Sequence, residues 1–317
     1  MRAAVRDRYG PPDVVELRES AKPEAADGEV LVRVRATSVN PADWYEVSGT
    51  PYFGRIAGGL RRPKSSRLGT DFAGTVEAVG KDVTQFRPGD EVFGGRSGAF
   101  AEYVTVPEDR AIVPKPAGVS FEQAAAMPIA GLTALQGLRD KGGIQAGKQV
   151  LVNGASGGVG TFAVQIAKSF GAEVTGVCST RNVELVRSLG ADHVVDYTRE
   201  DFTRGGRRYD IVLDVAGSRS WSEIKRVLDL HATVVLVGHE PMLGALLAHM
   251  LGSAQAGRLA FKKGGAALVD LPDGPAAPGR LIWFLDPRVL RTLADRSAIT
   301  RQISSTNGGR LREGKPS

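Results

Sequence analysis

Glycines between positions 153 and 160 form the stretch best suited to binding a ligand, in the order NGASGGVG. A phosphate reaches the free N–H groups and the dipole at a helix start only where no Cβ atom intervenes, which suits Gly154 and Gly157. Gly160, one turn further on, lets the helix lie close to a strand below it. Three spaced glycines also occur in loops by chance, so the flanking elements decide between the two interpretations. We predict that a dinucleotide diphosphate contacts this turn, which consists of Asn153, Gly154, Ala155, Ser156, Gly157, Gly158, Val159 and Gly160.

A second polar group, Ser179, Thr180 and Arg181, directly follows an apolar run that ends at Cys178. Enzymes that prefer the unphosphorylated nicotinamide dinucleotide commonly carry an acid at this place, where it binds the ribose hydroxyls. This chain has two hydroxyls and a guanidinium instead, a set that suits a 2′-phosphate, so we predict a preference for NADPH. The alternative is that Arg181 is only a solvated residue at a helix start, although a positive charge is mildly unfavourable there without an anion.

The elements that must position these groups alternate between short apolar runs and helical patterns. Residues 150–152 and 174–178 are predicted as strands on either side of a helix that follows the glycines. This alternation continues to Gly238 and indicates an α/β domain with a doubly wound parallel sheet covered on both faces. Further helices are expected at 182–190 and 219–229, and further strands at 193–196, 209–214 and 233–237. Ligands lie at the carboxyl ends of such strands, so the cofactor side should also include Ala216, within 214–217, and Gly238.

The first 115 residues are predicted to form a β domain of twisted strands, a partly open barrel. Strands are expected at 2–6, 29–39, 72–79, 91–94 and 100–106. A helix should begin after Ser120, which can cap it, and a second at 132–140, and together they connect the barrel to the cofactor domain. A basic loop at 60–67 is interpreted as a solvated surface loop, with a place at the edge of the active-site cleft as the alternative.

Composition excludes several other classes of protein. The chain of 317 residues is long enough for two domains. It has no apolar run near the length that crosses a bilayer, and its arginine-rich start does not read as a signal peptide. We therefore expect a cytoplasmic protein without a membrane partner. With one cysteine and four scattered histidines, no metal site is expected.

The net charge of +6 does not indicate nucleic-acid binding, because of where it lies. Residues 255–317 hold 11 of the 41 basic residues and 5 of the 35 acidic ones, so the first 254 residues carry 30 of each. The whole excess is in this last part of the chain, and no surface of interleaved aromatic and basic residues accompanies it.

Several segments of the chain are similar to those of a known family, with the spacing between them kept. They are 38–44 (SVNPADW), 68–76 (LGTDFAGTV), 86–94 (FRPGDEVFG), 98–103 (GAFAEY), 153–160 and 189–197 (LGADHVVDY). On these residues the chain, from its start to about residue 240, resembles the quinone oxidoreductase (zeta-crystallin-like) branch of the medium-chain dehydrogenase/reductase superfamily. The resemblance implies a GroES-like β domain joined to a Rossmann domain, and NADPH as hydride donor. It also implies reduction of a quinone or another α,β-unsaturated carbonyl, and a homodimer.

The zinc branch of that superfamily differs at its metal ligands. Its members carry Cys at the position of Asn40, His-Glu at Thr70 and Asp71, and a further Cys near 129–131, and this chain has none of these. The resemblance therefore implies a zinc-free enzyme and disfavours a zinc alcohol dehydrogenase. Without a metal, hydrogen-bond donors must polarise the substrate carbonyl.

The resemblance places the candidate catalytic residues in the VNPxD segment and just after it. Asn40 would make a side-chain amide hydrogen bond at the nicotinamide end, and Asp43 would hold that loop. Tyr45 and Tyr52 lie where related enzymes carry aromatic cleft residues, so either phenol could donate a hydrogen bond or a proton. The alternatives are that Asp43 only caps a turn and that Tyr52 only packs. Tyr197 matches the family's tyrosine near the adenosine phosphate, with core packing as its alternative.

Three parts of the chain are expected: a β domain at 1–115, a Rossmann domain with its leading helices at 116–254, and a divergent segment at 255–317. In this last part, glycines and prolines interrupt the strand, helix and strand through which the family returns to its β domain. The segment is either a divergent or partly disordered tail or the product of a reading-frame disturbance. Since either could affect activity, a cofactor-binding protein with little turnover is the alternative to an oxidoreductase.

Overall fold

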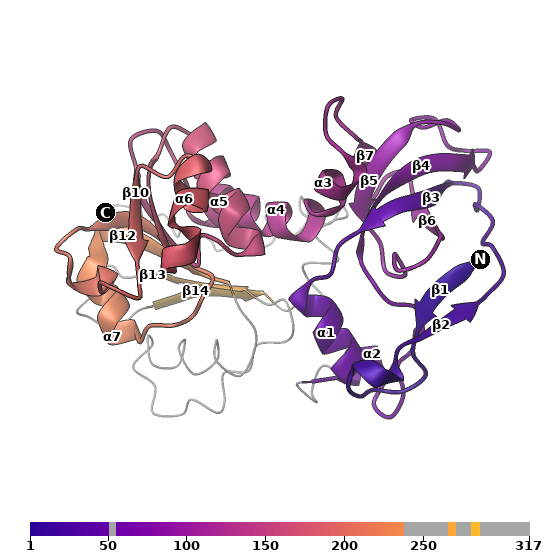
Figure 1. Cartoon of the computed structure of the whole chain (residues 1–317), viewed down its shortest axis with the longest axis horizontal. Helices are drawn as coiled ribbons and strands as arrows, with labels where there is room; N and C mark the ends of the chain where they lie inside the picture. The colour runs from indigo at the N-terminus through magenta and orange to yellow at the C-terminus, as the bar shows by residue number, and fades with distance from the viewer. Residues whose placement is uncertain (51–54, 238–265, 271–279, 286–317) are drawn as a thin grey trace, which may run out of the picture.

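The computed structural model describes residues 1–50, 55–237, 266–270 and 280–285, and it has a sheet at each end of the molecule (Figure 1). The first is a five-stranded antiparallel sheet in the order β6-β3-β4-β5-β7. Its strands are β3 (Glu29–Thr37), β4 (Asp71–Val79), β5 (Glu91–Gly95), β6 (Tyr103–Pro107) and β7 (Ile112–Pro114). Register shifts between β3 and β4 bend the sheet around a core made mainly of valines, together with Phe72, Phe86 and Ile112, which gives the predicted partly open barrel.

A two-stranded ribbon, β1 (Arg2–Val5) and β2 (Glu16–Glu19), lies beside this sheet. Single bridges from Ala3 to Ala101 and from Val5 to Arg67 connect it to the barrel. The strand predicted at 100–106 is shorter than expected, because β6 begins only at Tyr103. The residues before it pair with the ribbon instead.

The second sheet is parallel throughout, in the order β10-β9-β8-β11-β12. Its strands are β8 (Gln149–Asn153), β9 (Glu173–Cys178), β10 (His193–Asp196), β11 (Tyr209–Asp214) and β12 (Leu228–Leu236). The order reverses between β8 and β11, and the crevice at the carboxyl ends there is where ligands bind in this architecture. Cys178, at the end of β9, is buried in the core under this sheet, and burial raises the pKa of its thiol.

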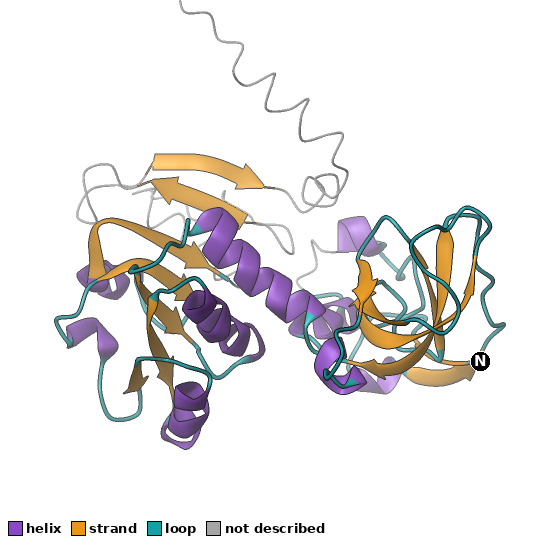
Figure 2. Cartoon of the chain, turned by 90° about the horizontal axis from the view of Figure 1, so that it is seen from above, coloured by secondary structure: helices purple, strands orange, loops and turns teal. Residues whose placement is uncertain are grey.

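Helices cover both faces of the parallel sheet, as predicted. α5 (Gly158–Ser169) and α6 (Val183–Ser188) pack on one face, together with α4 (Pro128–Leu135) and its π-helical continuation, Gln136–Lys141. α7 (Trp221–Ile224) and the short 3-10 turns Phe202–Arg204 and Lys225–Val227 pack on the other. In Figure 2, α4 runs from the barrel side of the molecule to the parallel sheet.

Three smaller helices lie in and beside the barrel: α1 (Pro41–Ser48), α2 (Arg55–Gly58) and α3 (Phe121–Ala125). Ser120 caps α3, since its Oγ accepts a hydrogen bond from Gln123 N at 3.2 Å. The second helix of the connection begins earlier than the predicted residue 132, at Pro128, a residue suited to the first turn of a helix.

One prediction for the parallel domain was wrong in its boundary. The helix expected over 219–229 ends as a short turn, and β12 begins at Leu228 rather than at residue 233. Pairing of β12 with β11 takes over these residues.

Of the segment 255–317, the structure describes two strands, β13 (Ala266–Asp270) and β14 (Arg280–Leu285), which pair antiparallel beside β12 (Figure 2). The remainder of the predicted divergent segment lies outside the described residues. Among the described helices, none has the length and apolar character needed to cross a membrane.

Candidate functional site

The glycine turn lies at the carboxyl edge of the parallel sheet, between the end of β8 and the first turn of α5. Gly154 has a φ of +91°, a left-handed conformation that favours glycine. A Cβ atom on Gly160 would collide with the carbonyl oxygen of Gly154, so only glycine lets α5 approach the turn. Gly157 is the N-cap of α5, and the first-turn N–H groups after it have no partner within the helix. The turn therefore offers backbone donors at a helix start, an arrangement that binds phosphate.

A buried couple of Asn153 and Asp214 supports this turn from the neighbouring strand. Asn153 Nδ2 donates to Asp214 Oδ1 at 2.8 Å, and Gly217 N donates to the same oxygen at 2.9 Å. Asp214 is 1% exposed, and its Oδ2 has no hydrogen-bond partner among the described residues. Burial raises the pKa of this carboxyl. The couple ties the end of β8 to the end of β11, across the point where the strand order reverses.

Ala216, the candidate that follows this couple, is exposed at the same edge. A Cβ atom on Gly154 would lie 3.3 Å from Ala216 N, so the segment after β11 packs against the glycine turn. The structure thus brings these two predicted cofactor segments together. Gly238, the third, lies outside the described residues.

The adenosine side of the predicted site is held together by Asn182, which sequence analysis did not include among the site residues. Its Nδ2 donates to Ser156 Oγ at 3.1 Å and to Ser179 Oγ at 3.2 Å. Ser156 belongs to the glycine turn and Ser179 to the end of β9, so one amide bridges the two predicted groups. Arg181 follows as an exposed residue in the 3-10 turn Thr180–Asn182.

Thr180 has a different setting from its neighbours. Its hydroxyl donates to Asp196 Oδ2 at 2.6 Å and lies 2.8 Å from the hydroxyl of Thr198. Thr198 N and Oγ1 donate to the other carboxylate oxygen of Asp196, and these bonds lower the pKa of Asp196. An acid therefore stands at this edge after all, at the end of β10 instead of β9. To contact a phosphate as predicted, the Thr180 hydroxyl would have to give up its hydrogen bond to Asp196.

Tyr197 extends from the same edge and is 55% exposed, so its packing in the core, the alternative interpretation, is wrong.

On the barrel side, Asn40 and Asp43 form the start of α1. Asn40 is the N-cap, and its backbone N–H donates to Asp43 Oδ2 at 2.7 Å. Asp43 is 3% exposed, so its carboxylate serves this helix start. Tyr45 is half-buried in α1, and Tyr52 lies outside the described residues.

The side-chain amide of Asn40 is also engaged. Its Nδ2 donates to Asp71 Oδ2 at 3.0 Å and to Ser38 Oγ at 3.2 Å. Ser38 Oγ and Ile129 N donate to the same Asp71 oxygen, at 3.0 and 3.3 Å. Asp71 has no exposed surface, and burial raises its pKa. In the sequence, Asp71 stands out only within the family-like segment 68–76 and as a position where zinc enzymes carry another residue.

These contacts test whether the site suits a zinc ion. The segments that carry ligands in the zinc branch do converge, because Asn40 and Ile129 both bind Asp71. They supply an amide, a backbone N–H and one carboxylate, with the hydroxyl of Thr70 beside them, whereas zinc prefers thiolate, imidazole and carboxylate ligands. This donor set does not suit zinc. Within the described ranges, no group of three or more His, Cys, Asp or Glu side chains could hold a metal ion.

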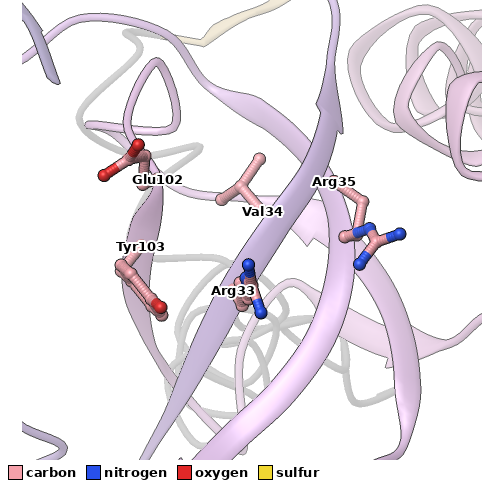
Figure 3. Close-up of a pocket in the computed structure, with 5 residues that line it drawn as sticks. All are labelled: Arg33, Val34, Arg35, Glu102 and Tyr103. Atoms are coloured by element: carbon pink, nitrogen blue, oxygen red, sulfur yellow. The ribbon is translucent and has the colours of Figure 1, made fainter. Parts of the chain in front are cut away.

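A surface hollow of about 350 Å³ lies elsewhere, on the barrel (Figure 3). Its lining comes from β3, from the first residue of β6 and from the residue before it, and is formed by Arg33, Val34, Arg35, Glu102 and Tyr103. None of the predicted site residues belongs to it. The hollow is a separate polar feature of the sheet surface.

Comparison with known proteins supports both halves of this architecture. Residues 26–117 match the family model described as alcohol dehydrogenase GroES-like domain, and residues 158–255 match the one described as zinc-binding dehydrogenase. A chloroplastic quinone-oxidoreductase from Triphysaria versicolor is 37% identical over 256 residues, which cover 74% of this chain and 74% of the relative.

Two further proteins add chemical detail. A 2-methylene-furan-3-one reductase from Solanum lycopersicum is 37% identical over 246 residues, which cover 73% of this chain but only 60% of that reductase. The structure of an Escherichia coli quinone oxidoreductase complexed with NADPH superposes with a TM-score of 0.64 at 29% identity, covering 74% of this chain and 72% of that one.

Proposed function

Because the chain belongs to the quinone oxidoreductase branch of the medium-chain dehydrogenase/reductase superfamily, we propose that it transfers a hydride from NADPH to a quinone or another α,β-unsaturated carbonyl, without a catalytic zinc. The observation that carries this proposal is the open glycine turn at the reversal point of the parallel sheet. The names of the relatives support it, since one is a quinone-oxidoreductase and another reduces a furanone.

The preference for NADPH over NADH rests on Ser179 and Arg181. Ser179 Oγ accepts from Asn182, which leaves its own hydrogen for a phosphate oxygen. Arg181 is exposed and can form a charge-assisted bond with a 2′-phosphate. The acid at this edge, Asp196, is engaged by Thr180 and Thr198, so it is not directed at a ribose hydroxyl. The NADPH complex of the Escherichia coli relative is consistent with this preference.

Arg181→Ala tests the preference directly. We expect the KM for NADPH to rise about tenfold, the effect of one charge-assisted hydrogen bond, with the KM for NADH almost unchanged. Steady-state kinetics with both cofactors measures this, with Arg187→Ala as a matched control because its guanidinium pairs with Glu184 on α6. Equal effects of Arg181→Ala on both cofactors would contradict the assignment.

The chemistry left to the protein is to orient the carbonyl and to stabilise the enolate that develops on its oxygen. When bound, the reduced nicotinamide supplies the hydride. The Asn40 amide hydrogens already have acceptors in Ser38 and Asp71, which leaves the phenols of Tyr45 and Tyr52 as the candidate donors. We propose Tyr45 and Tyr52 for this role, with Asn40 and Asp43 shaping the wall of the cleft.

A survey of acceptors tests the overall proposal. Purified protein should oxidise NADPH with 1,4-benzoquinone and with a simple enone, but not with a saturated aldehyde, and a zinc chelator should leave the rate unchanged. Tight NADPH binding without turnover on any acceptor would favour the alternative of a cofactor-binding protein. Unchanged turnover in both Tyr45→Phe and Tyr52→Ala would dispose of the proton-donor role.

We also propose the domain limits 1–115, 116–254 and 255–317, a homodimer, and a cytoplasmic location. All five strands of the antiparallel sheet end by Pro114, and α3 begins at Phe121, which supports the first limit. Limited proteolysis checks the limits, and light scattering after gel filtration checks the dimer.

A further inference from the structure

The carboxylate of Asp71 joins three separate segments of the chain inside the molecule. Its Oδ2 accepts hydrogen bonds from Ser38 Oγ, Asn40 Nδ2 and Ile129 N, at 3.0, 3.0 and 3.3 Å. Ser38 and Asn40 precede α1, Asp71 begins β4, and Ile129 lies in the first turn of α4. Asp71 is fully buried, so water does not replace these partners.

The first consequence concerns the orientation of Asn40. Asn40 Nδ2 donates to Asp71 and to Ser38, so both hydrogens of the amide have acceptors on the protein. A rotation of the amide by 180° would bring its oxygen against the Asp71 oxygen, which is also an acceptor. The three side chains therefore form a closed triangle that fixes the amide plane.

The second consequence concerns α4. The N-cap of this helix, Met127, provides no side-chain hydrogen bond, so the first-turn N–H groups need another acceptor. Asp71 supplies one from β4, and an acidic group near a helix N-terminus is favourable. α4 then packs against α5, whose first turn carries the glycines of the dinucleotide site.

We propose that Asp71 is a positioning residue, which fixes the amide of Asn40 and the first turn of α4 relative to each other. Asp71 thereby aligns the barrel wall of the proposed cleft with the helix that leads to the dinucleotide turn. This inference rests on the proposed function for its kinetic part only. Its geometric part concerns a hydrogen-bonded triangle that exists with or without turnover.

The asymmetry of the carboxylate makes the proposal testable with a conservative variant. All three donors bind Oδ2, whereas Oδ1 has no hydrogen-bond partner among the described residues. In Asp71→Asn, the amide oxygen can take the place of Oδ2, and the NH2 group can occupy the place of Oδ1. Asp71→Leu keeps a similar volume but accepts no hydrogen bond.

The first measurement follows the side-chain NH2 resonances of Asn40 by ¹⁵N NMR, assigned by their loss in Asn40→Ala. In the wild type and in Asp71→Asn, their exchange with solvent should be slow. In Asp71→Leu it should be faster by at least about tenfold, because the main acceptor is gone. If Asp71→Leu does not fold, Ser38→Ala serves instead. It removes one of the two acceptors of the Asn40 amide and should also make the exchange faster. Exchange that is equally slow in Asp71→Leu and Ser38→Ala would overturn the proposal.

The second measurement is a kinetic cycle with NADPH and 1,4-benzoquinone. We expect Asp71→Leu to lower kcat about tenfold while the KM for NADPH changes less than about twofold, and Asp71→Asn to retain kcat. In the Asn40→Ala background, Asp71→Leu should lower kcat by less than about threefold further, since its effect acts through Asn40. Asp109→Asn, at an exposed carboxylate on the barrel, is the matched control.

Fully additive effects of Asn40→Ala and Asp71→Leu on kcat would overturn the kinetic part. A wild type without turnover would instead refute the proposed function, and the NMR result would still decide whether Asp71 fixes Asn40. The two failures are thus distinguishable.

Discussion

Asn182 illustrates how a single amide sets the chemistry of its neighbours. Because Ser156 Oγ and Ser179 Oγ each accept one of its hydrogens, each hydroxyl is left with its own hydrogen to donate. These two donors lie at the glycine turn and at the end of β9, where the diphosphate and the ribose phosphate are proposed to bind. The amide thus converts two ambivalent hydroxyls into donors for anions.

Replacing the hydrogen-bond donor at position 182 by an acceptor should weaken the binding of both cofactors. Asn182→Asp replaces the donor by an acceptor, so the serines would donate to the new carboxylate, which also repels phosphate. We expect the KM for NADPH and for NADH to rise at least about tenfold, and Asn182→Ala to cause a smaller rise. Fluorescence titration with both cofactors measures the effect. A variant that binds both as the wild type does would contradict the bridging role.

Asp214 leads to a prediction about stability. Asp214→Ala leaves Asn153 Nδ2 and Gly217 N without their buried acceptor, so we expect it to lower the free energy of unfolding by about 1–3 kcal/mol. Asp214→Asn keeps an acceptor oxygen and should be tolerated. Urea denaturation of the three proteins at pH 7 checks this order.

The pH dependence of the same variants has a defined sign. Burial raises the pKa of Asp214 in the folded protein above its value in the unfolded chain. The contribution of this carboxyl to the free energy of unfolding is therefore fully present below the unfolded-state pKa, and it is lost as the pH rises through the folded-state pKa. The stability of Asp214→Asn relative to the wild type should therefore improve between pH 4 and pH 8. A constant difference across this range would show that the carboxyl does not titrate differently on folding.

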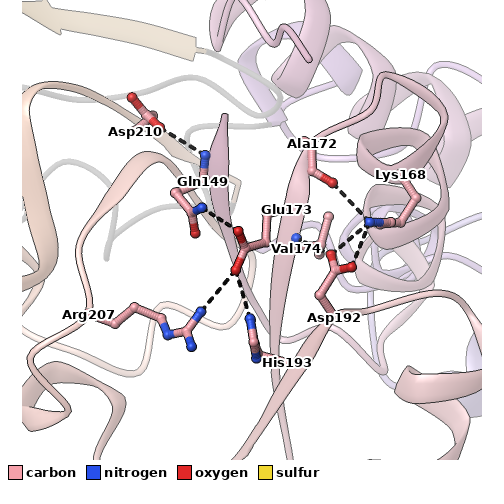
Figure 4. A network of polar contacts seen from close by, with 9 residues as sticks. All are labelled: Gln149, Lys168, Ala172, Glu173, Val174, Asp192, His193, Arg207 and Asp210. Atoms are coloured by element: carbon pink, nitrogen blue, oxygen red, sulfur yellow. Dashed lines mark hydrogen bonds and ion pairs between the residues drawn. The ribbon is translucent and has the colours of Figure 1, made fainter. Parts of the chain in front are cut away.

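At the scale of elements, a polar network joins the amino ends of the parallel strands, at the edge opposite the glycine turn (Figure 4). Glu173, on β9, accepts from Gln149 at 2.5 Å and from Arg207 at 3.2 Å, and lies 2.7 Å from His193 Nε2 on β10. Two further pairs, Lys168 with Asp192 and Lys148 with Asp210, flank it. The network connects β8, β9 and β10 at their amino ends, opposite the proposed cofactor site.

This network should matter for acid stability and not for catalysis. The bonds from Gln149 and His193 lower the pKa of Glu173 below its ordinary value of 4.5. The ionised Glu173 side chain therefore stabilises the folded state above pH 4.5, and this stabilisation is lost as the pH falls through the lowered pKa. The melting temperature of Glu173→Gln should fall less steeply than that of the wild type below pH 4.5, with the KM for NADPH unchanged at pH 7. Parallel curves would contradict this contribution.

The elements also show where sequence patterns succeed and where they fail. Trp221, Ile224, Val227 and Leu228 are all buried and follow a helical spacing, which fits the helix predicted over 219–229. Pairing with β11 overrides that local pattern from Leu228 onward. Conversely, α1 was not predicted although its signals are present: Asn40 at the N-cap, Pro41 at the first helical position and Asp43 two residues later.

At the scale of the molecule, the glycine turn and the polar group after β9 could be predicted from the sequence, because local spacing encodes both. Asp214 lay within the predicted cofactor-side segment 214–217, but neither its couple with Asn153 nor a site role for Asp71 or Asp196 was predicted. Their partners come from other segments, such as Asn40 for Asp71 and Asn153 for Asp214, and no local pattern reports such a contact. Buried polar couples become visible only when the strands are placed side by side.

The whole molecule contains separate hydrophobic cores, one within the barrel and others on the two faces of the parallel sheet. We therefore expect two calorimetric transitions. NADPH should raise mainly the midpoint temperature of the transition that belongs to the parallel domain. At a free concentration of 100 times its Kd, the cofactor should add about 2.7 kcal/mol to the stability of that domain. A single transition, shifted as a whole, would show that α4 couples the two domains into one cooperative unit.

Cys178, the lone thiol at the end of β9, gives the natural chain a practical advantage. Enclosed under the sheet, it should be silent toward maleimide reagents in the native state. Two engineered surface cysteines, one on each domain, could then carry spin labels without any background substitution, and the distance between the two domains in solution could be measured.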